Sequence, residues 1–149
     1  MDSGVLAAIM GIIGILIVIA LIWLVISIIA SWRIFTKAGE AGWKCLIPFY
    51  NSYVQFSFTW NTNIFWVWFG LSMVSNLISI IGGKNPGMII SLISFAIAVV
   101  VGVISIIATH KLSKAFGHGV GFTLGLLFLN PIFMLILAFG SSEYQGIPD

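Results

Sequence analysis

Side chains that could do chemistry are few in this sequence and lie far apart along it. They are one cysteine (Cys45), two histidines (His110 and His118) and ten charged residues among 149. A single cysteine cannot form an intrachain disulfide, and two histidines with four scattered carboxylates do not indicate a metal site. Because we also find no nucleophile–base pair and no phosphate-binding loop, the sequence predicts a protein that is not an enzyme and has no cofactor.

The composition points to lipid as the solvent. Hydrophobic residues make up 60% of the chain and charged residues only 7%, whereas soluble domains carry about a quarter of their residues as charges. The net charge of +2 is small and no basic run occurs. We therefore expect no nucleic-acid partner, since binding to phosphates needs clustered cations.

Four charge-free apolar runs predict four transmembrane helices, at about residues 5–31, 64–81, 88–109 and 120–140. The first run would form about 39 Å of helix, against roughly 30 Å of hydrocarbon in a bilayer. The predicted fold is therefore an all-α integral membrane protein, with residues 1–149 forming a single membrane domain.

The segment at about residues 43–60 has a different residue pattern from the four apolar runs. Polar residues and a proline recur at steps of three and four on one face: Lys44, Pro48, Asn51, Gln55 and Thr59. Aromatic residues, Phe49, Tyr50 and Tyr53 among them, occupy the opposite face. This pattern predicts an interfacial amphipathic helix with Pro48 in its first turn. Whether it lies on the bilayer or dips into it stays open at this stage.

Charge placement predicts the orientation. With four spans, the basic residues divide five against one, and the larger group faces the cytoplasm by the positive-inside rule. Both termini and Lys84 would then lie outside, and we expect His110 and His118 to be solvated at the interface. The side chains predicted to meet lipid headgroups are Arg33, Lys37, Trp43, Lys44, Trp60, Lys111 and Lys114.

Small residues recur at four-residue spacing on two predicted spans. Such stripes let helix backbones approach closely. The two predicted helices either pack together within one chain or present a stripe to a second copy or a foreign subunit. The residues concerned are Gly117, Gly121 and Gly125 on one stripe and Ser94, Ala98 and Gly102 on the other.

Polar residues also fall inside predicted spans. Ser72, Asn76 and Ser79 form a stripe on the second span, and Asn130-Pro131 lies in the middle of the fourth. Proline should kink that helix. Asn130 should either cap the broken backbone locally, bond Asn76 or a serine across the bundle, or mark a broken-helix substrate or ion site. No predicted span contains an ionisable residue, which argues against a proton-coupled transporter.

Two sequence blocks resemble a family. The stretch KAGEAGWKCLIPFYNSYV at residues 37–54 resembles the pattern K-A-G-x-x-G-W-x-x-x-I-P-x-Y-N, and residues 114–140 resemble a second, glycine-rich block. Together they look like a bacterial family of small multipass membrane proteins, a domain of unknown function with some members labelled signal peptidase I. That label implies a Ser/Lys hydrolase, which this chain does not suit because Lys84 is its only predicted outer lysine.

The sequence therefore favours a non-enzymatic subunit or scaffold of the bacterial cytoplasmic membrane. It would associate with copies of itself or with a partner membrane protein through small-residue helix faces, and would bind lipids through its basic, aromatic belt. The alternative is an oligomeric channel or passive transporter lined by Ser72, Asn76, Ser79 and Asn130.

Overall fold

The computed structural model describes residues 2–83 and 86–149, and secondary structure in these residues is entirely helical. This confirms the all-α prediction. In chain order the elements are α1 (Ser3–Lys37), the 3₁₀ helix η1 (Gly42–Leu46), α2 (Tyr50–Thr59), α3 (Thr62–Gly82), α4 (Met88–Ala115), α5 (Val120–Phe128) and α6 (Asn130–Phe139). Lys84, the residue predicted to face outside, lies beyond the described part of the chain.

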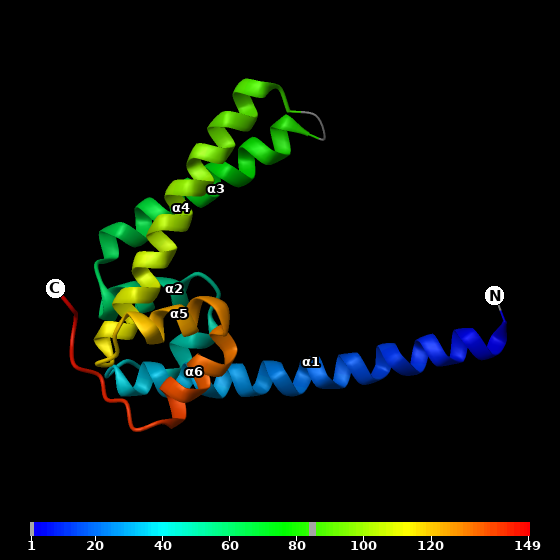
Figure 1. Cartoon of the computed structure of the whole chain (residues 1–149), viewed down its shortest axis with the longest axis horizontal. Helices are drawn as coiled ribbons and strands as arrows, with labels where there is room; N and C mark the ends of the chain where they lie inside the picture. Colours follow the sequence, from blue (N-terminus) through cyan, green and yellow to red (C-terminus); the bar gives the residue numbers. More distant parts are fainter. Residues whose placement is uncertain (1, 84–85) are drawn as a thin grey trace.

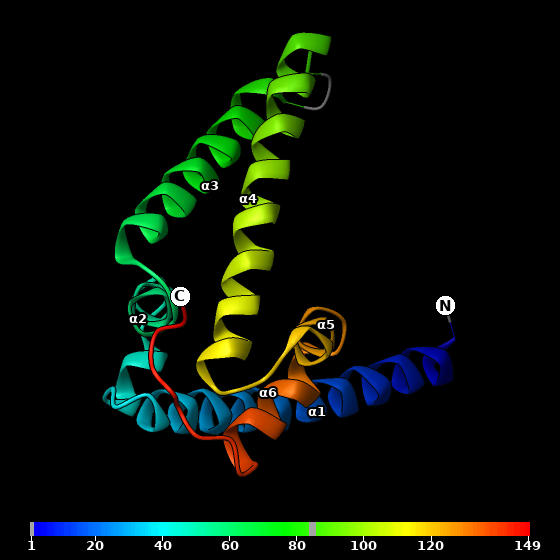
Figure 2. The same ribbon diagram turned by 60° about the vertical axis from the view of Figure 1, so that its left-hand side comes forward.

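Two apolar arms diverge from one packed junction (Figures 1 and 2). Helix α1 forms one arm alone, and α3 with α4 forms the other. Helix α1 packs against η1 and α6, whereas α3 packs against α4 and α2. The hydrophobic core lies at the junction, where the C-terminal ends of α1 and α4 meet α2, α5 and α6. Its residues are Ala30, Ile34, Phe35, Val54, Phe58, Leu112, Ala115, Phe116, Leu126, Leu137 and Ala138.

Three of the helices are long and apolar enough to cross a membrane. They are α1, α3 and α4, with 35, 21 and 28 residues, and they contain the predicted spans 5–31, 64–81 and 88–109. None of the most apolar 18-residue stretch of α1 or of α4 is buried within the chain. An apolar helix surface of this kind suits lipid or another transmembrane helix as its neighbour.

The predicted fourth span at 120–140 is wrong as a single helix. The segment forms two short helices, α5 with nine residues and α6 with ten, each about 15 Å long or less and too short to cross roughly 30 Å of hydrocarbon. At Leu129 the backbone leaves the helical region, with φ −124° and ψ 40°. Pro131 then stands in the first turn of α6, so the expected kink is a complete break and the chain folds back.

The predicted helix at 43–60 is also divided. Helix η1 ends at Leu46 and α2 begins at Tyr50, so Pro48 lies in the connection rather than in a first helical turn. The N–H of Tyr50 donates to Pro48 O at 2.8 Å around Phe49, whose φ is +65° and ψ −45°. This is a γ-turn of the rare, strained kind.

Helix α2 does not leave its polar side open to the surface, because Asn51 and Gln55 are partly buried. Val54, Phe58 and Thr59 are all buried, Thr59 with only 1% of its surface exposed, although Thr59 belongs to the predicted polar side. The helix contacts both α3 and α4. It is therefore a part of the junction rather than a helix lying free on the membrane surface.

Candidate functional site

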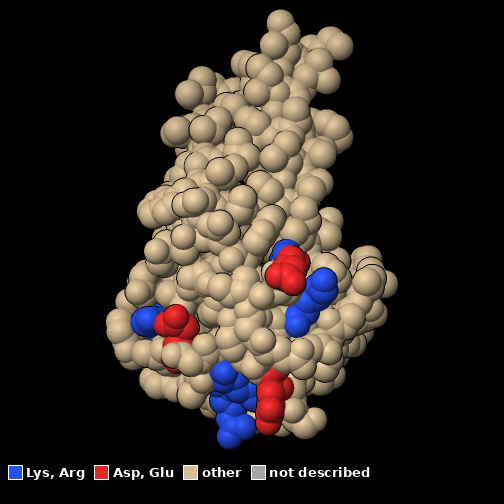
Figure 3. All heavy atoms as spheres, turned by 90° about the vertical axis from the view of Figure 1, so that its left-hand side faces the viewer, with Lys and Arg blue, Asp and Glu red and all other residues tan. Residues whose placement is uncertain are grey.

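Charged side chains gather at the junction, and the visible described surface of the α3–α4 arm carries none (Figure 3). Apart from Asp2, every charged residue in the described ranges belongs to the end of α1, the turn after it, the end of α4 or the C-terminal tail. The junction therefore contains the polar groups from which a candidate site would have to be built.

Lys37 is engaged within the chain rather than free to meet headgroups. Its ammonium donates to the backbone oxygens of Leu137 at 2.8 Å, Gly140 at 2.9 Å and Ser142 at 3.0 Å. The last carbonyls of a helix have no partner inside the helix, and a cation there is favoured by the helix dipole. Lys37 thus caps α6 and fixes the start of the tail.

The other basic residues differ in their surroundings. Lys111 donates to Pro148 O at 2.9 Å, and Lys44 forms a salt bridge of 2.6 Å with Glu40. The Arg33 guanidinium lies over the Phe139 ring, 4.7 Å from its centroid, and Lys114 is exposed. Of the predicted headgroup contacts, Lys37 and Lys111 instead hold the tail in place.

The two predicted tryptophans differ in exposure. Trp43 is half exposed, whereas Trp60 is partly buried with its ring stacked at 6.4 Å on Phe56.

The two histidines are bonded rather than solvated, which corrects the expectation for them. The His110 ring nitrogen Nδ1 lies 2.9 Å from Thr123 Oγ1, and His118 Nε2 lies 2.7 Å from Ser142 Oγ. The His118 ring also stacks on Phe122 at 4.0 Å. His110 thus joins α4 to α5, and His118 joins the loop after α4 to α5 and to the tail.

The turn between α1 and α2 is built from the residues of the first sequence block. Gly39 ends α1 with φ +81°, a conformation that glycine adopts without strain. A Cβ on Gly42 would overlap the indole ring of Trp32. Asn51 Nδ2 donates to Cys45 O at 3.2 Å, so the motif residues set the path of the chain.

Cys45 lies within this turn and is partly buried. Its thiol donates to Ile28 O at 3.9 Å, and burial raises the pKa of the thiol. No base among the described residues contacts it. The arrangement therefore keeps Cys45 in the thiol form, which is a poor nucleophile.

The small-residue stripes are not packed against each other. A Cβ on Gly102 or Gly121 would meet no atom within 4 Å, and Ser94 and Ala98 lie on the α3–α4 arm away from α5. The ring of Phe133 from α6 occupies the space where a side chain on Gly125 would lie. The side chain of Gln145 does the same at Gly117, whose φ is +76°. Helices α4 and α5 therefore pack together within one chain, as one alternative expected, but not through Gly102 or Gly121.

The predicted polar lining is not assembled in one chain either. Ser72 Oγ donates to Trp68 O at 2.7 Å and Ser79 Oγ to Ser75 O at 3.0 Å, both within α3. Asn76 is on the α3–α4 arm, whereas Asn130 lines a cavity of about 200 Å³ against α1, beside Ser27 and Ser31. The two asparagines therefore do not meet.

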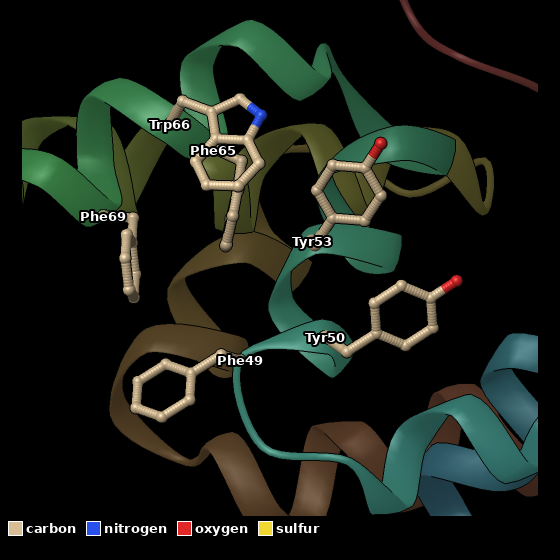
Figure 4. A pocket seen from close by; sticks show the side chains of 6 residues that line it. All are labelled: Phe49, Tyr50, Tyr53, Phe65, Trp66 and Phe69. Carbon is tan, nitrogen blue, oxygen red and sulfur yellow. The ribbon is translucent and has the colours of Figure 1, made fainter.

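Two features were missed by sequence reasoning. Trp68 Nε1 donates to Ser105 Oγ at 3.1 Å, linking α3 to α4. Six aromatic side chains also enclose an open groove of about 340 Å³ (Figure 4). The groove residues are Phe49, Tyr50, Tyr53, Phe65, Trp66 and Phe69. Only the first three were recognised as an aromatic face, because the others fall inside a uniformly apolar run.

The comparison with known families gives one match. The profile of a family of unknown function, DUF5684, matches residues 43–147. The chain belongs to this family. A search of curated proteins found no match, and neither did a search of solved structures.

The matched DUF5684 region begins at Trp43 and so contains the groove, the α3–α4 arm, the α5–α6 hairpin and most of the tail. It excludes α1, although Ala30, Ile34 and Phe35 of α1 complete the core. Family membership therefore agrees with the sequence resemblance but attaches no activity to the junction.

Proposed function

We propose that this DUF5684 chain is a non-enzymatic subunit of the bacterial cytoplasmic membrane that works by lateral association with other transmembrane helices. The observation that carries the proposal is the divergence of the two arms from a single packed junction. Each arm exposes apolar surface along nearly its whole length, as with Ile15, Ile81 and Met88 at 63%, 81% and 79% exposure. The described residues therefore enclose neither a pore nor a reaction chamber, and the two arms present membrane-embedded faces to other helices.

In the proposed topology three helices cross the bilayer and the α5–α6 hairpin enters it from the junction side. The turn of this hairpin is apolar, with Phe128 82% exposed and Leu129 50% exposed. Irregular backbone at membrane depth needs protein or a cavity beside it. Here Asn130 faces the cavity shared with Ser27 and Ser31 of α1.

The charge distribution supports a cytoplasmic junction. Five basic residues flank the junction ends of the spans, and Lys84, between α3 and α4, is the sixth. No lysine or arginine follows Lys114, so the five-to-one asymmetry is the same with three spans as with four. Three spans place the N-terminus outside and the C-terminal tail inside, which replaces the earlier prediction of both termini outside.

The test is the mass and composition of the complex extracted in native lipid without detergent exchange. We expect a defined assembly, either of several copies or with another membrane protein in fixed ratio. A chain that is monomeric and alone at native expression level would contradict the proposal. An assembly of copies that lets ions or solutes through liposome membranes would instead favour the channel alternative.

A further inference from the structure

Helix α3 has two sides with different surroundings. One side packs against α4 and contains Trp68, whose indole bonds Ser105. Part of the surface that is turned away from α4 is formed by Trp66, Phe69, Met73, Asn76 and Ile80, which we call the α3 seam. These residues recur at steps of three and four, so they fall within about 100° of the helix circumference.

Asn76 is the unusual member of the seam. Its amide Nδ2 donates to Ser72 O at 2.7 Å, and its side chain is exposed. No donor among the described residues bonds its carbonyl oxygen. It follows Ile64 by 12 residues, about 18 Å along the helix, which places it within the hydrocarbon of a span covering residues 64–81. An amide facing lipid there lacks hydrogen bonds that another helix could supply.

The aromatic groove lies on the same side of α3, nearer the junction. Trp66 and Phe69 of the seam form one wall, and Trp66 is 60% exposed. The strained turn at Phe49 places its ring 5.6 Å from that of Phe69, and the hydroxyls of Tyr50 and Tyr53 point away from these two rings (Figure 4). The groove is therefore an apolar opening at the base of the face that exposes Asn76.

We propose that a second copy of this chain covers the α3 seam. Copies inserted in the same orientation can pair through one face only about a two-fold axis along the membrane normal, so each residue meets its own counterpart at equal depth. An amide is both donor and acceptor. Two Asn76 side chains can therefore bond each other reciprocally, which an aliphatic residue at this position could not do.

The same two-fold axis accounts for the groove. The Trp66 side chain of the second copy lies at the depth of the groove, and large aromatic side chains fill apolar openings of this kind. One occupant, a second copy, thus covers two separate features of this face, the amide of Asn76 and the open groove. This inference rests on the proposed function and names its partner as an identical chain.

Disulfide crosslinking in native membranes tests the seam. In a Cys45→Ser background that keeps Asn76, Met73→Cys of the seam is compared with Val74→Cys, which lies at nearly the same depth but about 100° away around the helix. Met73 is 39% and Val74 44% exposed, so both thiols are accessible. We expect dimers from Met73→Cys and few from Val74→Cys. Equal crosslinking of the two variants would contradict the proposal that a second copy covers the α3 seam.

A second measurement tests the amide. Energy transfer between labelled copies in liposomes should show that Asn76→Leu weakens dimerisation by about three- to thirty-fold, the range known for polar contacts between membrane helices. Asn76→Gln, which keeps the amide, should retain most of the affinity. If the Asn76→Leu complex keeps its mass and affinity, a second copy does not cover the α3 seam, and the proposed function still stands. If the wild-type chain is monomeric and alone, both the dimer and the proposed function are wrong.

Discussion

At the scale of single residues, we expect replacement of Lys37 to have the clearest effect on the fold. Its three bonds to backbone oxygens join the end of α1 to α6 and the tail. Lys37→Met keeps the length of the side chain but leaves these oxygens without a donor, at a cost of about 2 kcal/mol. We expect faster hydrogen exchange across residues 140–149, including the Gln145 N–H that donates to Ala115 O. Lys114→Met should change nothing, and equal exchange in both variants would contradict the capping role.

Cys45 allows a test of the turn through pH. The thiolate is the reactive form, and burial raises the pKa of this thiol, so the reactive fraction at neutral pH is smaller than for a free cysteine. Maleimide labelling of the native protein in lipid should be slow at pH 7 and accelerate as the pH rises above the range of an ordinary thiol. Labelling as fast as that of a free thiol at pH 7 would show that the turn is open.

At the scale of elements, the long helices were predicted correctly from the sequence and the short ones were not. The helices α1, α3 and α4 were predicted because apolar runs of 18 residues or more have few other stable arrangements. The run at 120–140 is equally apolar, yet it forms two helices because the Leu129 backbone and Pro131 separate them and Phe133 folds back onto Gly125. The hydropathy of the sequence carries no information about this tertiary contact between Phe133 and Gly125.

The candidate site was predicted less well than the spans. Lys37 and Lys111 were recognised as interfacial cations, but their acceptors are backbone oxygens about 100 and 37 residues away in sequence. Such partners leave no residue pattern, because any residue type supplies a carbonyl. The strain at Phe49 was also invisible, since a positive φ is expected at glycine rather than at phenylalanine.

Two glycines of the α5–α6 hairpin, Gly121 and Gly125, allow a prediction with a matched control. A side chain at Gly125 would overlap the Phe133 ring, whereas Gly121 faces open space. We therefore expect Gly125→Leu to destabilise the fold by about 1–3 kcal/mol, as overpacking does, and Gly121→Leu to have little effect on stability. Unfolding in lipid micelles, followed by tryptophan fluorescence, measures both. A larger loss for Gly121→Leu would mean that this face is covered in the native protein.

At the scale of the whole molecule, the spans differ in length. The charge-free part of α1 extends about 39 Å, whereas residues 64–81 of α3 extend about 27 Å. In one bilayer with roughly 30 Å of hydrocarbon, the longer helix has to tilt or project. A tilt of about 40° is enough to fit it, so helix length accounts for only part of the wide divergence between α1 and the α3–α4 arm in Figure 2.

The topology of the chain is the prediction that separates three spans from four. The C-terminal tail lies against the junction, where Lys111 bonds Pro148 O and the Tyr144 hydroxyl donates to Phe58 O at 2.6 Å. If α5–α6 is a hairpin that returns to its starting side, a C-terminal reporter should be cytoplasmic while an N-terminal one is external. A reporter pair that is active only inside or only outside the cell measures this, with a fusion after Thr109 as the cytoplasmic control. A C-terminal reporter found outside would restore the fourth span and would require the tail to leave the junction.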